Sequence, residues 1–149
     1  MILIYEHYTS ADPAREAELA RVRELNAAAG IFETILPVAE GGRKRFSDLF
    51  ALAAERFRGE ICVVANSDIA FDASLAGAES LMRRHDRPVL LALSRWDDPS
   101  GPSMEGRIDP ETWRFYSHSQ DTWVFVAGGL PAFNAEFTLG IPACESRLA

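Results

Sequence analysis

The segment ICVVANSDIAFD, Ile61 to Asp72, decides how the rest of the chain is interpreted. Its first five residues are apolar, which is typical of a short strand covered on both faces of a sheet. The run then ends in three polar residues, Asn66, Ser67 and Asp68. Because ligands of open α/β sheets bind at the carboxyl ends of the strands, a carboxylate at this point is a candidate for a functional site.

Apolar segments of this kind alternate with amphipathic segments along the chain. Strands are predicted over residues 2–5, 32–38, 61–69, 88–97 and 119–129, with Pro37 ending the second. Helices are predicted between Pro13 and Gly30, over 46–57 and over 72–84. This alternation predicts an α/β fold, a three-layer α/β/α arrangement around a mostly parallel sheet, in a single domain of residues 1–149.

The first two predicted helices each have one apolar face. Ser10 or Asp12 is expected to cap the first helix, Pro13 suits its first turn, and Gly30 suits its end. Residues at three- to four-residue spacing form its buried face, namely Leu19, Val22, Leu25 and Ala29. The buried face of the second helix consists of Phe46, Leu49, Phe50, Ala53 and Phe57.

Composition limits the classes of partner. Of 149 residues, 22 are acidic and 15 are Lys or Arg, so the net charge of −7 disfavours nucleic acid and anionic membranes as general partners. The two cysteines, Cys62 and Cys144, give no zinc spacing and no disulfide framework, although a bridge between them stays open. The start of the chain lacks the pattern of a signal peptide, and no apolar run is long enough to span a membrane. We therefore expect a cytoplasmic protein.

Each candidate residue at the strand ends also has a purely structural interpretation. Asp68 either holds a divalent ion together with diphosphate oxygens and water, or caps the turn into the third helix. Asp121 is either a general base or a turn residue, and Glu145 is either a base or a first-turn helix acid. Arg95 and Trp96 pack as a stacked surface pair in the structural interpretation.

Motifs of several nucleotide-binding and hydrolytic classes are absent from the sequence. There is no G-x-G-x-x-G, no G-x-x-x-x-G-K-[ST] and no G-x-S-x-G. The sequence therefore disfavours dinucleotide binding, a P-loop enzyme and an α/β-hydrolase nucleophile.

Four segments in order, VVANSDIAFDASL, LLALSRWD, SQDTWVF and LGIPACESRLA, resemble the nucleotide-diphospho-sugar transferases, glycosyltransferases of the GT-A fold. In that family an apolar strand leads into a short acidic motif that holds Mn²⁺ or Mg²⁺ on the diphosphate of the donor. The resemblance implies a UDP- or GDP-sugar as donor and an acceptor whose identity the sequence does not give. It implies that Asp68 is the metal ligand, with Asn66 and Ser67 completing the motif.

The resemblance also assigns roles outside this motif. Glu145 matches the acid that starts the catalytic helix of inverting members, and Asp121 is the competing candidate for the catalytic base. The remaining candidates on the donor side of the site are Thr9, Ser10, Arg45, Asp48, Arg95 and Trp96.

The chain departs from the family pattern at two places. It carries an amide, Asn66, where the motif usually begins with an acid, and it ends just where the catalytic helix is expected to begin. Two hypotheses follow: a metal-dependent glycosyltransferase, or a truncated or degenerate member that acts as a catalytically inactive binding or interaction module. The sequence leaves the donor base and sugar, and the oligomeric state, undetermined.

Overall fold

The computed structural model describes residues 1–39, 43–97, 114–116 and 120–139. Their strands and helices alternate over most of the chain, as the sequence predicts. In chain order the elements are β1 (Ile2–Glu6), α1 (Pro13–Ala28), β2 (Thr34–Val38), α2 (Phe46–Arg56), β3 (Ile61–Ala65), the short 3₁₀ helix η1 (Ala73–Leu75), α3 (Ala76–Arg84), β4 (Leu90–Leu93), β5 (Arg95–Asp97), β6 (Arg114–Tyr116) and β7 (Thr122–Val126).

The main sheet has five strands in the order β2-β1-β3-β7-β4. Strand β1 pairs in parallel with β2 and β3, whereas β7 pairs antiparallel with both β3 and β4. The predicted α/β class is therefore confirmed, and the sheet is mixed because one strand runs against the other four. Strands β5 and β6 form a separate two-stranded antiparallel sheet.

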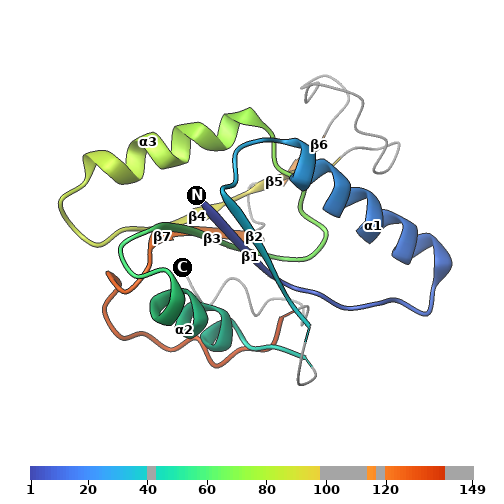
Figure 1. Ribbon diagram of the computed structural model, residues 1–149, viewed down its shortest axis with the longest axis horizontal. Helices are drawn as coiled ribbons and strands as arrows, with labels where there is room; N and C mark the ends of the chain where they lie inside the picture. The colour runs from blue at the N-terminus through green and yellow to red at the C-terminus, as the bar shows by residue number, and fades with distance from the viewer. Residues whose placement is uncertain (40–42, 98–113, 117–119, 140–149) are drawn as a thin grey trace.

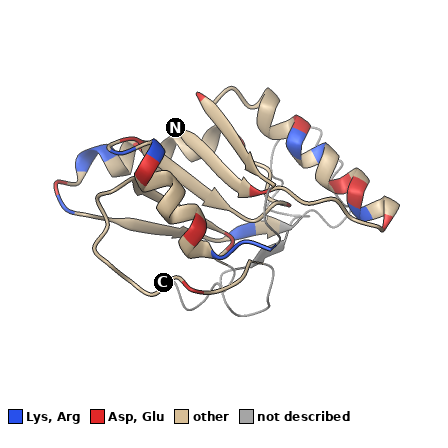
Figure 2. Ribbon diagram, turned by 60° about the horizontal axis from the view of Figure 1, so that its bottom comes forward, with Lys and Arg blue, Asp and Glu red and all other residues tan. Residues whose placement is uncertain are grey.

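Helices cover both faces of the five-stranded sheet. Helix α2 lies on one face, which we call the α2 face, and α1 and α3 lie on the opposite side (Figure 1). One apolar cluster joins α2 to alternate residues of β1, β3 and β7, and a second cluster on the other face includes Leu75 and Met82. Charged residues gather on the helices and loops, and the strands carry few of them (Figure 2). The sheet is thus buried between two layers.

Helix α1 begins as predicted and buries a partly different set of residues. The Asp12 carboxylate accepts a hydrogen bond from the Ala14 amide at 2.9 Å, so Asp12 rather than Ser10 is the N-cap. Leu19 and Val22 are buried, but the third buried position is the polar Asn26 instead of Leu25. A buried amide needs hydrogen-bond partners, and Asn26 finds them in a neighbouring loop.

Helix α2 has the predicted apolar face. Phe46, Leu49, Phe50 and Ala53 are buried, and the Phe46 ring packs edge-on against Trp123 at 4.6 Å between centroids. Cys62 of β3 is a buried free thiol in the described part of the chain, and burial raises its pKa to about 12. At neutral pH this thiol is protonated, which fits the predicted role of core packing.

Two strand boundaries differ from the prediction. Pro37 lies inside β2 instead of ending it, which is possible because β2 is an edge strand and its outer side needs no ladder donor. The predicted strand 88–97 divides into β4 and β5, which belong to different sheets. Among the described residues, no helix is both long and apolar enough to cross a membrane.

The packing of α2 on the sheet gives a first prediction. Phe46→Ala removes a fully buried ring from the contact with Trp123 and should lower the free energy of unfolding by about 3–5 kcal/mol. Phe133→Ala is the matched control, because Phe133 also packs edge-on against a ring, that of Phe50, but is 40% exposed. Urea denaturation of both variants checks this; equal losses would contradict the placement of α2 against β7.

Candidate functional site

Three polar side chains form a row at the carboxyl end of β1 and β3. Tyr5 pairs with Ala65, and Ala65 pairs with Thr122, so the next rung of the sheet contains Glu6, Asn66 and Asp121. All three follow the alternation of the core residues on the α2 face. We call Glu6, Asn66 and Asp121 the polar row. The apolar side chains of the α2 face end at this row.

Asp121 is one of the two buried carboxylates of the polar row. It is 7% exposed, and its two oxygens accept separate hydrogen bonds, from Asn66 Nδ2 at 3.0 Å and from Arg95 Nη1 at 2.8 Å. Its backbone carbonyl accepts a third bond from the Asn66 amide at 3.0 Å. The guanidinium of Arg95 compensates a charge that would otherwise be costly to bury. Two predicted site residues, Asn66 and Arg95, therefore converge on a third.

Glu6 anchors the other end of the polar row. It is 3% exposed, and its carboxylate accepts hydrogen bonds from Arg43 Nη1 at 2.9 Å and from the Lys44 amide at 2.8 Å. Its backbone carbonyl accepts the hydroxyl of Ser67. Glu6 thus connects β1 with the segment before α2 and with the turn after β3. It was missed by the sequence analysis, although an acid that ends an apolar run is the pattern seen at β3.

Asp68 belongs to a different network from Asp121. Its carboxylate pairs with Arg15 Nη2 at 2.6 Å, and the same guanidinium contacts Glu18 and the hydroxyl of Tyr8. Burial opposes the charge of Arg15, but the hydrogen bonds to these three groups outweigh it and raise the pKa of Arg15 above its usual value. The Asp68 side chain remains 35% exposed. The proposed metal ligand therefore already has a cationic partner.

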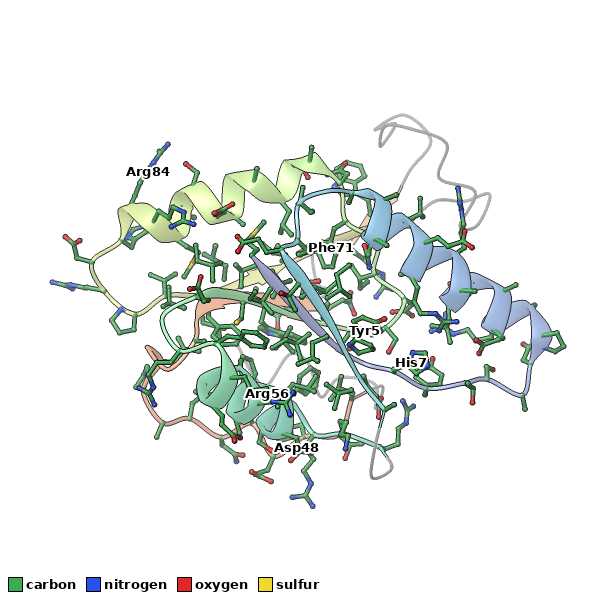
Figure 3. The ribbon with its side chains drawn as sticks, in the orientation of Figure 1. Tyr5, His7, Asp48, Arg56, Phe71 and Arg84 are labelled. Carbon is green, nitrogen blue, oxygen red and sulfur yellow. The ribbon has the colours of Figure 1, made fainter. Side chains whose placement is uncertain are left out.

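The turn that carries Asp68 is fixed by the buried Asn26 of α1. Asn26 Nδ2 donates to the Ile69 carbonyl, and the Phe71 amide donates to Asn26 Oδ1, both at 2.9 Å. Figure 3 shows Phe71 between α1 and α3, on the side of the sheet that both helices cover. The helix thus holds both Arg15 and the loop on which Asp68 lies.

The loop between β1 and α1 contains Thr9 and Ser10, two of the residues predicted to lie on the donor side of the site. Thr9 is exposed, and the Ser10 hydroxyl accepts a bond from the Asp12 amide at 3.2 Å. The Ser10 amide donates to Glu16 at 2.8 Å, and this bond, together with the ion pair to Arg23, lowers the pKa of Glu16. Thr9 and Ser10 therefore lie in a loop whose hydrogen bonds organise the start of α1.

Arg45 and Asp48 lie at the start of α2, where they bond to each other and Arg45 also contacts the segment after β7. The Arg45 amide donates to Asp48 Oδ2 at 2.9 Å, and the Arg45 guanidinium pairs with Glu136 at 2.7 Å. Both side chains are exposed, and Figure 3 shows Asp48 on the outer side of α2, away from His7. These contacts give both residues a structural role at the start of the helix. Their contact with a nucleotide stays a prediction.

The other predicted residues are placed as follows. Trp96 lies in β5 next to Arg95 and pairs with Phe115 of β6. Glu145 lies outside the described residues. In the part of the chain that is described, no three His, Cys, Asp or Glu side chains form a group that could hold a metal ion. A metal at Asp68 therefore needs most of its ligands from a bound molecule and water, which is how Mg²⁺ is commonly held.

Comparisons with known proteins give no relative. The sequence matches no protein-family profile and no curated protein, and the fold matches no solved structure. The interpretation of the site therefore rests on its residues and their geometry.

The contact between Asn26 and the loop after β3 gives a second prediction. Asn26→Ala removes both hydrogen bonds and should cost about 2 kcal/mol of stability, since each lost bond leaves a backbone group without a partner. Hydrogen exchange at the Phe71 amide should become faster by more than the global loss of stability explains. Glu24→Ala, at an exposed position of the same helix, is the control and should leave this amide unchanged. Unaltered protection of Phe71 in the Asn26 variant would contradict the contact.

Proposed function

We propose that this chain is a glycosyltransferase of the GT-A type, which transfers a sugar from a UDP- or GDP-sugar to an acceptor. The observation that carries the proposal is the buried Asp121, held by Asn66 and Arg95 at the carboxyl end of β3. A fixed, charge-compensated carboxylate at this edge of an α/β sheet is more than a turn requires. Asp68, two residues beyond Asn66, adds a second carboxylate that is open to solvent.

The architecture supports this proposal at a coarser level. A three-layer α/β protein with a mixed sheet is compatible with the GT-A fold. The antiparallel strand β7 begins at the carboxyl end of β3, so it delivers Asp121 to the same edge as the acidic motif. Both candidate acids are thus close to the place where a diphosphate-linked sugar would be bound.

Asp68 is the proposed ligand for Mn²⁺ or Mg²⁺. Only Asp68 Oδ2 takes part in the ion pair with Arg15, and a carboxylate can offer its second oxygen to a cation. A divalent ion at this point supplies positive charge to the leaving diphosphate as the sugar bond breaks. Arg15 competes for the same carboxylate, because two cations at one carboxylate repel each other. Asn66 orients Asp121 instead of adding a negative charge to the metal site.

The catalytic base is Asp121 or Glu145. Asp121 has the fixed position that a base needs, and each of its oxygens keeps one lone pair beyond the bonds to Asn66 and Arg95. Deprotonation of the acceptor hydroxyl by either residue makes that oxygen the nucleophile.

A catalytically inactive binding module is the second candidate function. The ion pair between Arg15 and Asp68 favours it, because the pair already neutralises the proposed metal ligand without any ion. Hydrolysis of UDP-glucose and GDP-mannose in the presence of Mn²⁺ separates the two candidates. Release of nucleotide above the rate without protein supports the enzyme, and no release above that rate supports the binding module.

Thermal unfolding with UDP and with GDP, each with and without Mn²⁺, tests the donor site. The protein should be stabilised by one nucleotide only when Mn²⁺ is present, and a ligand at 100 times its dissociation constant adds ~2.7 kcal/mol. Asp68→Ala should abolish this stabilisation, whereas Arg15→Ala should increase it because the competing cation is removed. The unliganded stability of Asp68→Ala should fall by at most about 1 kcal/mol, since the ion pair is partly exposed.

Asp86→Ala is the control for this experiment, because Asp86 is an exposed acid that follows α3. It should retain the full response to nucleotide and Mn²⁺. A full metal-dependent response of Asp68→Ala would reject the role of Asp68. The lack of any response of the unmodified protein to both nucleotides would reject the proposed donor site.

A further inference from the structure

Among the described residues, buried side-chain atoms without a hydrogen-bond partner occur in His7, Asn66, Gln120 and Trp123. Two of these atoms lie on the α2 face with Asp121: the indole nitrogen of Trp123, whose side chain is fully buried, and the carbonyl oxygen of the Asn66 side chain. Buried polar groups are nearly always paired, so each unpaired atom calls for a partner that the described residues do not supply. One is a donor and the other is an acceptor.

These two residues are neighbours on the α2 face. Trp123 pairs with Val64 across β3 and β7, and Asn66 lies two residues beyond Val64 on the same side of the sheet. Diagonal neighbours of an antiparallel pair are about 7–8 Å apart at their Cα atoms, within the reach of an aromatic side chain. Trp123 is also two residues from Asp121, so all three side chains face the same side.

The orientation of Asn66 follows from its contact with Asp121. A carboxylate only accepts hydrogen bonds, so Asn66 must turn its NH₂ group toward Asp121, where the distance is 3.0 Å. The carbonyl oxygen of the amide is therefore directed away from Asp121 and remains an acceptor. The indole nitrogen of Trp123 can only donate.

A ligand group that serves both atoms must accept one hydrogen bond and donate another. A hydroxyl does both, whereas an ionised phosphate oxygen only accepts and a metal ion cannot accept a bond from an indole. The carboxylates of Glu6 and Asp121 lie in the same polar row and offer further acceptors for neighbouring hydroxyls. The chemistry of the row and of Trp123 thus fits a neutral, polyhydroxylated group.

We propose that Trp123 and Asn66 bind one hydroxyl of a sugar, with the indole donating to its oxygen and Asn66 accepting its proton. The assignment of this hydroxyl to the sugar of a nucleotide donor rests on the proposed function. An ordered water has the same donor and acceptor capacity, and the experiment must distinguish these two sources.

Heteronuclear NMR of the whole chain tests the proposal through the indole N–H signal of Trp123. The chain has three tryptophans, and the Trp96→Phe and Trp113→Phe variants each lose one indole signal, so the signal that both variants keep belongs to Trp123. UDP-glucose, GDP-mannose, UDP, GDP, and free glucose and mannose are the probes. One nucleotide-sugar should shift the Trp123 indole signal, and the corresponding nucleoside diphosphate should shift backbone amides but leave the indole signal in place.

Affinities measured by calorimetry give the second readout. Asn66→Ala should weaken binding of that nucleotide-sugar about tenfold, which corresponds to about 1.4 kcal/mol, and leave the affinity for the nucleoside diphosphate unchanged. Asn134→Ala, which removes an exposed amide from a loop, is the matched control and should leave both affinities unchanged.

Each result has a defined meaning. Backbone amides that respond to a nucleotide-sugar while the Trp123 indole does not would overturn the inference and leave the proposed function intact. An indole signal that keeps its contact to water at saturating nucleotide-sugar would show an ordered water only and would overturn it as well. If no nucleotide shifts any amide, the proposed function fails. The free sugars then test the hydroxyl site by themselves. A shift of the Trp123 indole signal with a free sugar supports the site, and no shift rejects it.

Discussion

The antiparallel pairing of β3 with β7 is the contact on which the rest of the structure depends. Because β7 runs against its neighbours, its beginning, and not its end, meets the carboxyl end of β3. Asn66 and Asp121, which are 55 positions apart, are thereby joined by two hydrogen bonds, one from the side chain and one from the backbone amide of Asn66. With the opposite direction, Asp121 would lie at the far edge of the sheet and the polar row would lack one of its two carboxylates.

Much of the fold could be predicted because it depends on local patterns. Apolar runs locate the strands. Helix α1 is located by Asp12 and Pro13 at its start and by apolar residues that recur every three to four positions. The direction of β7 could not be predicted, because a strand of five residues has the same pattern in either direction. The position of Pro37 inside β2 depends on β2 being an edge strand, which only the strand order shows.

The candidate site was predictable in its position but not in its pairings. An acid after a buried strand identified Asp68 and an acid just before a strand identified Asp121, yet the partner of Asp68 is Arg15, 53 positions away on a helix surface. Asn66 was expected to complete the metal-binding motif, whereas it bridges two strands by side-chain and backbone bonds to Asp121. Glu6 was overlooked because it ends a strand without being part of a motif. Trp123 was overlooked because it looked like an ordinary core residue.

The strand order also sets the sequence of events during synthesis. Strands β1, β2 and β3 can pair once residue 65 has left the ribosome, but the other side of β3 waits for residues 122–126. Until then ICVVA, Ile61–Ala65, presents an unpaired and wholly apolar edge, which is the kind of edge that joins to other chains. The same reversed strand that completes the polar row is therefore also the one that later covers the apolar edge of β3.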